Sequence, residues 1–126
     1  MIRIFGVCKN DLFLKMIDPM LNTWGISIAA ITRTTNDAVQ KFIESKADIV
    51  ILDANWNYTS LSAKDILANF LNHDKSCKVV MITTFYDPKI EEQFFTLGAQ
   101  GYIYRNVTSL DSIVECITSV YDSLGI

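Results

Sequence analysis

Near the middle of the chain, residues 47–53 read Ala-Asp-Ile-Val-Ile-Leu-Asp, so that four branched apolar side chains stand in a row and a carboxylate ends the run. A continuous apolar run of this length is typical of a strand that is buried on both faces, as in parallel sheets covered by helices. We therefore predict a central parallel strand over Ile49–Leu52, with Asp53 at its carboxyl end.

Similar short apolar runs flank this segment, and we predict strands over Ile2–Val7, Ile26–Ile31, Val79–Ile82 and Tyr102–Tyr104. Between them, apolar residues recur three or four positions apart, which indicates helices with one buried stripe. These helical stretches span residues 12–21, 38–43, 66–71, 90–97 and 110–121. Strands that alternate with helices form right-handed βαβ units. The predicted fold is α/β: a flavodoxin-like, doubly wound (βα)5 three-layer sandwich with a five-stranded parallel sheet.

Local signals at the ends of the helices agree with this fold. Asp87-Pro88 supplies a capping carboxylate and then a proline at the first helical position. Gly98 stands where a helix C-terminus requires a left-handed residue. Residues 108–111, Thr-Ser-Leu-Asp, resemble a capping box in which Thr108 caps and an Asp replaces the usual Glu.

Composition predicts one globular domain over residues 1–126, long enough to bury a core without a metal or disulfide. The net charge of −3 argues against a general nucleic-acid-binding surface. Three cysteines without CxxC spacing predict neither a disulfide framework nor a zinc site. No apolar stretch approaches the ~20 residues that span a bilayer, and the N-terminus does not resemble a signal peptide. We therefore expect a cytoplasmic protein that makes no membrane contact.

Ligands of an open α/β sheet bind beyond the carboxyl ends of its strands. At this edge Asp53 is either a turn or cap residue, or a nucleophilic carboxylate that accepts a phosphoryl group. Thr83 ends the next strand and could place a hydroxyl beside it, while Tyr102 and Arg105 could supply an aromatic ring and a cation. No glycine-rich loop follows the first strand, which disfavours dinucleotide and P-loop phosphate binding.

Taken in order, these positions resemble the receiver domain of two-component response regulators, particularly those of the NarL/LuxR type. The resemblance covers essentially the whole chain. Its most specific parts are residues 47–53, residues 80–87 (Val-Met-Ile-Thr-Thr-Phe-Tyr-Asp) and residues 97–105 (Leu-Gly-Ala-Gln-Gly-Tyr-Ile-Tyr-Arg). It implies that Asp53 is the phosphoacceptor position, Thr83 the switch hydroxyl and Tyr102 the switch aromatic residue.

The chain departs from that family at the metal site. The family places two acidic residues directly after the first strand, where they hold Mg²⁺, whereas this chain has Cys8 and Lys9. A thiol beside an ammonium group is a poor site for a hard cation. Arg105 replaces the family's lysine, and the usual Met-Pro turn after the acceptor is replaced by a loop containing Asn55 and Trp56. These departures predict a pseudo-receiver with no metal, no cofactor and no catalytic residues.

The leading hypothesis is a non-catalytic regulatory module that acts by dimerisation or partner docking. The resemblance implies a homodimer contact on the face of the fourth helix, fifth strand and fifth helix, where Phe85, Tyr86, Phe95 and Tyr104 gather. It also implies a sensor histidine kinase as a possible partner. DNA would be contacted only through a C-terminal helix-turn-helix domain that is absent from these 126 residues.

Two alternatives remain open at this point. A working phosphoacceptor receiver would bind Mg²⁺ through Asp53, the Asn55 carbonyl and an acid from elsewhere, and a histidine kinase would phosphorylate it at Asp53. An unrelated enzyme on a flavodoxin-like fold is the third hypothesis. If the site instead carries a built-in cation, Lys9 and Arg105 are the candidates. We expect Lys9 to pair with Asp53, so that Lys9→Ala destabilises the domain by on the order of 1–3 kcal/mol.

Overall fold

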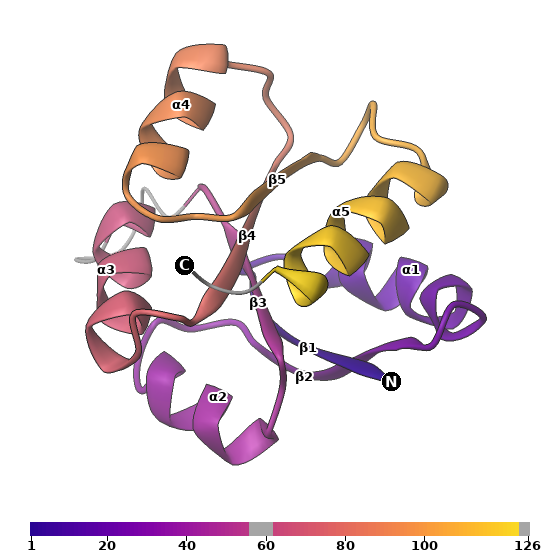
Figure 1. Ribbon diagram of the computed structural model, residues 1–126, viewed down its shortest axis with the longest axis horizontal. Coiled ribbons are helices and arrows are strands. Elements are labelled where there is room, and N and C mark those ends of the chain that lie inside the picture. Colours follow the sequence, from indigo (N-terminus) through magenta and orange to yellow (C-terminus); the bar gives the residue numbers. More distant parts are fainter. Residues whose placement is uncertain (56–61, 124–126) are drawn as a thin grey trace.

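A computed structural model describes residues 1–55 and 62–123, in which five strands alternate with five helices (Figure 1). No helix in these two ranges is long and apolar enough to cross a membrane. In chain order the elements are β1 (Ile2–Val7), α1 (Leu12–Asn22), β2 (Ile26–Thr32), α2 (Ala38–Ser45), β3 (Ile49–Asp53), α3 (Ala63–His73), β4 (Lys78–Thr83), α4 (Pro88–Thr96), β5 (Gly101–Tyr104) and α5 (Leu110–Asp122).

The strands form one parallel sheet in the order β2-β1-β3-β4-β5, which confirms the predicted doubly wound topology. Strand β3 is central, and all five of its residues are buried. It runs one residue further than predicted, because Asp53 still pairs with Ile82 of β4. The chain changes its direction of winding between β1 and β3, so the carboxyl ends of these two strands border the crevice where such sheets bind ligands.

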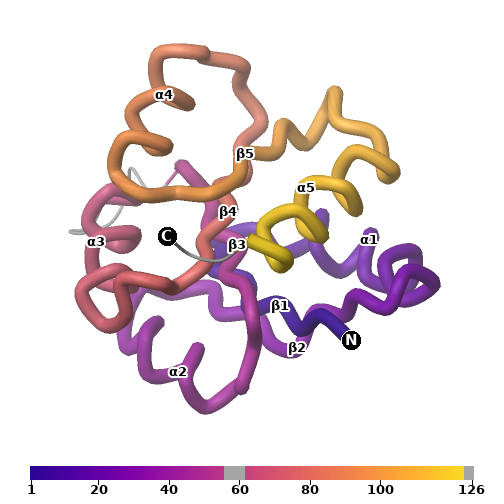
Figure 2. Tube along the Cα trace, viewed as in Figure 1, coloured from indigo at the N-terminus to yellow at the C-terminus, as the bar shows by residue number. Residues whose placement is uncertain are grey.

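Helices cover both faces of the sheet, as the predicted three-layer sandwich requires. In Figures 1 and 2, α1 and α5 lie on one face, and α2, α3 and α4 lie on the other. Side chains of a strand alternate between the faces. Ile49 and Ile51 therefore pack with the α1 and α5 residues, whereas Val50 and Leu52 pack with those of α2, α3 and α4. This double burial explains why the sequence of β3 is continuously apolar.

Two of the three predicted helix ends are confirmed. Asp87 Oδ1 accepts hydrogen bonds from the backbone N–H groups at positions 89 and 90, and Pro88 opens α4. Gly98 has φ +114°, the left-handed conformation expected after α4. The predicted cap at Thr108 is wrong by one residue. Ser109 is the cap of α5, since its hydroxyl accepts from the Ser112 N–H, while the Thr108 hydroxyl accepts from the Tyr104 N–H.

Candidate functional site

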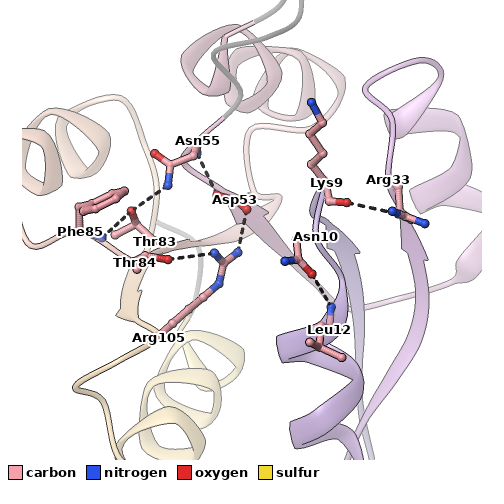
Figure 3. A network of polar contacts seen from close by, with 10 residues as sticks. All are labelled: Lys9, Asn10, Leu12, Arg33, Asp53, Asn55, Thr83, Thr84, Phe85 and Arg105. Carbon is pink, nitrogen blue, oxygen red and sulfur yellow. Dashed lines mark hydrogen bonds and ion pairs between the residues drawn. The ribbon is translucent and has the colours of Figure 1, made fainter.

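The site is built around the carboxylate of Asp53, which is buried at the carboxyl end of β3. The turn that follows β3 holds it: the Asn55 N–H donates to Asp53 Oδ1 at 2.9 Å, and the Ala54 N–H donates to the Ile82 carbonyl at 2.9 Å. Figure 3 shows the carboxylate among side chains from several elements. One oxygen of Asp53 therefore already has a backbone partner.

Arg105 supplies the partner of the other oxygen. Its Nη2 lies 2.7 Å from Asp53 Oδ2, and its Nη1 donates to Thr84 Oγ1 at 3.2 Å. The Arg105 N–H also donates to the Thr83 carbonyl, which fixes the backbone just after β5 against the end of β4. The two charged side chains are 16% and 6% exposed, for arginine and aspartate respectively. A permanent cation is thus held against the carboxylate with little access for water.

Thr83 is buried at the end of β4, and its hydroxyl links two segments of the site. It accepts hydrogen bonds from the Phe85 N–H at 3.4 Å and from Asn55 Nδ2 at 3.5 Å (Figure 3). The side chain of Asn55 therefore joins the predicted switch hydroxyl to the turn that holds Asp53. The structure thus brings Asn55 and Thr83 together at the carboxyl ends of β3 and β4.

Cys8 and Lys9 follow β1 at the other border of the crevice. Cys8 is fully buried, and its burial, reinforced by the negative charge of Asp53, raises the pKa of the thiol from 9.0 to about 12. Cys8 is therefore a neutral thiol at neutral pH. Lys9 has an exposed side chain, which Figure 3 shows extending out from the strand end, and its carbonyl accepts from Arg33 Nε at 3.2 Å.

Asp53 forms an ion pair with Arg105, whereas the sequence led us to expect a pair with Lys9. Within residues 1–55 and 62–123, the charged group that lies within 4.0 Å of the Asp53 carboxylate belongs to Arg105. The Arg105 side chain is long enough to cross the end of β4 and place its guanidinium beside Oδ2. The Lys9 side chain, in contrast, is exposed at the surface. The predicted energetic coupling between Lys9 and Asp53 stays a prediction.

The described residues do not fit the Mg²⁺ ion that the resemblance implies. Mg²⁺ prefers oxygen ligands in octahedral geometry, and the two positions after β1 present a thiol and an ammonium instead. Each oxygen of Asp53 already accepts a hydrogen bond, Oδ1 from the Asn55 N–H and Oδ2 from the Arg105 guanidinium. Outside residues 56–61 and 124–126, no three His, Cys, Asp or Glu side chains are placed to hold a metal ion. We therefore derive no chemistry through a metal here.

A second feature of this end of the molecule is a row of rings, which we call the aromatic surface (Phe85, Tyr86, Phe95, Tyr102 and Tyr104). The Tyr104 ring lies 5.1 Å from both the Tyr86 and the Tyr102 rings, and Tyr102 continues to Phe95 at 6.4 Å between centroids. Burial raises the pKa of Tyr102 to about 12, so its hydroxyl stays neutral. Phe85 and Tyr86 are the most open rings, at 74% and 73% exposed.

The predicted site residues fall into two groups. Asp53, Asn55, Thr83 and Arg105 are joined by hydrogen bonds, and buried Cys8 lies beside them. Tyr102 belongs to the aromatic surface instead, together with the predicted interface rings. Trp56 lies outside the described residues.

The sequence prediction gave no role to Thr84, which holds the second nitrogen of Arg105. Two adjacent hydroxyl residues at the end of a predicted strand were the available signal.

Comparison with known families bears on the third hypothesis, an unrelated enzyme. The family model described as "Response regulator receiver domain" matches residues 7–118. The chain belongs to this family. Receiver domains are signalling modules of two-component systems, so membership replaces the hypothesis of an unrelated enzyme on the same fold. In this receiver domain the carboxylate of Asp53 is paired with Arg105.

Individual proteins that are similar to this chain are also named as regulatory proteins or response regulators. The transcriptional regulatory protein LnrK of Bacillus subtilis is 28% identical over 97 residues, which are 76% of this chain and 42% of that protein. The chain thus matches less than half the length of that relative. Solved structures with the same fold include a LuxR-family DNA-binding response regulator from Staphylococcus aureus (21% identity, 97% of this chain and 100% of that one, TM-score 0.79). Another is a receiver domain protein from Clostridium thermocellum (19%, 97% and 95%, TM-score 0.80).

Proposed function

We propose that this receiver domain regulates a partner or an output domain without Mg²⁺-dependent phosphorylation of Asp53. The observation that carries the proposal is the 2.7 Å ion pair between Arg105 and Asp53. It places a permanent positive charge on the carboxylate that other receivers present to a metal and a phosphoryl group. The residues at positions 8 and 9 support the same conclusion, since neither carries a carboxylate.

Phosphoryl transfer to a carboxylate requires a free attacking oxygen and cations that neutralise the transferred group. Here Oδ1 of Asp53 accepts from Asn55, and Oδ2 is bound to the guanidinium. The planar guanidinium also bridges to Thr84, which a lysine, as a compact point charge, would do less well. Arg105 therefore stabilises one arrangement of β3, β4 and β5 that does not depend on a phosphoryl group.

The signal would then pass through a surface whose geometry does not depend on a phosphoryl group. The aromatic surface on α4 and β5 supports docking or homodimerisation, because exposed tyrosine and phenylalanine rings are enriched in interfaces. Since LnrK is named as a transcriptional regulatory protein, we propose a transcriptional output through a DNA-binding domain outside these 126 residues. A histidine kinase would bind this domain by docking rather than by phosphoryl transfer.

Magnesium and beryllofluoride titrations test the proposal. A Trp24→Phe chain leaves Trp56, three positions after Asp53 in the sequence, as its single tryptophan reporter. We expect no saturable change of its fluorescence with millimolar Mg²⁺, with or without beryllofluoride. The matched control is the triple variant Cys8→Asp/Lys9→Asp/Arg105→Lys, which restores the family's residues and is expected to respond to both.

Intact-mass measurement after incubation with acetyl phosphate and Mg²⁺ gives an independent result. We expect no phosphoryl adduct on the wild-type chain and a partial adduct on the triple variant. A saturable response of the wild-type chain that disappears in Asp53→Asn, together with an adduct, would contradict the proposal. That result would establish the alternative, a working phosphoacceptor that binds Mg²⁺ by another route.

A further inference from the structure

Strand β2 lies at one edge of the described sheet, and its sequence is well suited to pairing with a further strand. Its seven residues, Ile26–Thr32, read Ile-Ser-Ile-Ala-Ala-Ile-Thr and include no charge, proline or glycine. Short uncharged segments with high β-propensity are those that add most readily to another strand. Edge strands usually carry a lysine or a proline against such pairing, or are covered by another element. Because β2 has neither residue, its protection depends on a cover.

Hydrogen bonds to β1 show which backbone groups of β2 face the open edge. The Ile2 N–H donates to the Gly25 carbonyl at 2.8 Å, so this carbonyl faces β1. Successive residues of a strand direct their backbone groups to opposite sides. The Ile26 carbonyl and the Ile28 N–H therefore point away from β1, to the edge at which a further strand would bind.

Two side chains of α1 bind these two groups. Asp18 Oδ1 accepts from the Ile28 N–H at 2.9 Å. Asn22, with its amide oriented so that the nitrogen faces carbonyls, donates to the Ile26 carbonyl at 2.9 Å and to the Asp18 carbonyl at 3.2 Å. Asp18 and Asn22 stand four positions apart, which places them on the same side of the helix. One side of α1 thus closes two neighbouring pairing positions of the β2 edge.

The ladder between β1 and β2 changes register directly after these positions. Ile4 pairs with Ile28, but Phe5 pairs with Ala30, so Ala29 is an extra residue in β2. A bulge of this kind interrupts the regular spacing that a further strand would need. The regular part of the edge is therefore the part that α1 covers.

We propose that the β2 edge is a pairing surface for a second copy of this chain, and that Asp18 and Asn22 keep it closed. A symmetric pair would set two β2 strands side by side about a two-fold axis, joined through their backbone groups. The strand is uncharged, so like charges on β2 do not oppose this pairing. The aromatic surface lies over α4 and β5, at the opposite edge of the sheet, so this assembly is distinct from the homodimer of the proposed function.

Removal of both side chains tests the inference on the complete chain. The parent chain and all variants carry Phe85→Glu/Tyr86→Glu, so that association through the aromatic surface does not contribute. Asp18→Ala/Asn22→Ala frees the two backbone groups, and alanine is a good helix former. We expect sedimentation to give a dissociation constant for self-association on the order of tenfold lower than that of the parent chain, as two additional backbone hydrogen bonds imply. At concentrations where both chains are monomeric, amide exchange at Ile28 should be faster in the variant.

Two matched variants separate an open edge from a general loss of stability. Asp18→Asn keeps an oxygen that can accept from the Ile28 N–H, so it should self-associate no more than the parent chain. Val120→Ala shortens a buried side chain of α5, which destabilises the domain and leaves the β2 edge closed. It should also self-associate no more than the parent chain. Urea unfolding gives the loss of stability of each variant, against which its self-association is compared.

A peptide locates the pairing surface. The probe has the sequence of residues 26–32 between lysine flanks, and its control has the same sequence with every backbone nitrogen of these residues methylated, which removes the donors. We expect the unmodified peptide to bind the Asp18→Ala/Asn22→Ala chain in calorimetry, and the methylated peptide not to bind it. Neither peptide should bind the parent chain.

Any of three results would overturn the inference. The first is self-association of the Asp18→Ala/Asn22→Ala chain no stronger than that of the parent. The second is self-association of either matched variant as strong as that of this double variant, because it would show that the association does not come from the freed backbone groups. The third is equal binding of the unmodified and the methylated peptide.

Discussion

Arg105, at the end of β5, reaches across β4 and binds Asp53 on β3, with 2.7 Å between Nη2 and Oδ2. The pair therefore closes the carboxyl edge of three neighbouring strands, and Thr84 on the intervening segment holds the same guanidinium. An arginine at this position neutralises the carboxylate without a metal ion. It also ties the residue that follows β4 to the end of β3.

The first prediction concerns the stability that this pair supplies. Arg105→Ala leaves a nearly buried carboxylate without its cation, and we expect the free energy of unfolding to fall by about 3 kcal/mol. The double variant Arg105→Ala/Asp53→Ala should recover most of that loss, because both charges are removed. The free energy of unfolding of Arg105→Lys should lie between those of the wild type and Arg105→Ala, since lysine keeps the charge and loses the bridge to Thr84. Urea unfolding measures these variants, the Asp53→Ala single variant and the wild type, and additive losses of the two alanine variants would show that the two residues are not coupled.

The second prediction ranks Lys9 below Arg105. The Lys9 side chain is exposed, and exposed ion pairs contribute little to stability. We now expect Lys9→Ala to lower the free energy of unfolding by less than about 1 kcal/mol, which is at or below the lower end of the range expected from the sequence. The check is a second cycle, Lys9→Ala with Asp53→Ala, in the same urea series. If the coupling energy between Lys9 and Asp53 were as large as that between Arg105 and Asp53, this ranking would be wrong.

A third prediction follows from the raised pKa of Cys8. The thiol has a pKa of about 12 in the folded chain and 9.0 when solvated, so the folded state holds its proton more tightly. Its contribution to stability is therefore complete below about pH 9 and is lost as the pH rises toward about 12. Wild type should lose more stability than Cys8→Ala between about pH 8 and about pH 11.

The control for Cys8 is Cys116→Ala, because Cys116 is only partly buried. We expect this variant to follow the alkaline loss of the wild type more closely than Cys8→Ala does. Thiolate absorbance of the native protein provides the direct readout. If Cys8 ionised in the folded chain near pH 9, the explanation by burial and by the charge of Asp53 would fail.

Much of the fold was predictable because it rests on local patterns. The continuous apolar run Ile49–Leu52 is required by burial on both faces, and Asp87-Pro88 and Gly98 mark helix ends by their own conformational preferences. The cap of α5 was misplaced by one residue since Thr108 and Ser109 both carry a hydroxyl. Only the backbone shows which hydroxyl faces the free N–H groups.

The partner of Asp53 depended on three-dimensional reach, which the sequence pattern does not contain. Lys9 and Arg105 carry the same charge and follow strands on opposite sides of β3, so both were reasonable candidates. The longer guanidinium crosses β4 and meets the carboxylate, with Thr84 as a second anchor. The pair of hydroxyls at the end of the predicted strand indicated a polar position but not the partner of Thr84, because that partner lies 21 residues further along the chain.

The last prediction concerns the aromatic surface, whose rings differ in what their substitution would disturb. Phe85 and Tyr86 are about three-quarters exposed, whereas Tyr104 is half-buried between the rings of Tyr86 and Tyr102. If this surface makes a homodimer, Phe85→Glu/Tyr86→Glu should abolish self-association in sedimentation and leave the unfolding temperature nearly unchanged. Tyr104→Glu should weaken self-association as well but also destabilise the domain, because it buries a charge among rings. A wild-type chain that stays monomeric at high concentration would exclude the homodimer and leave docking to a different protein as the use of this surface.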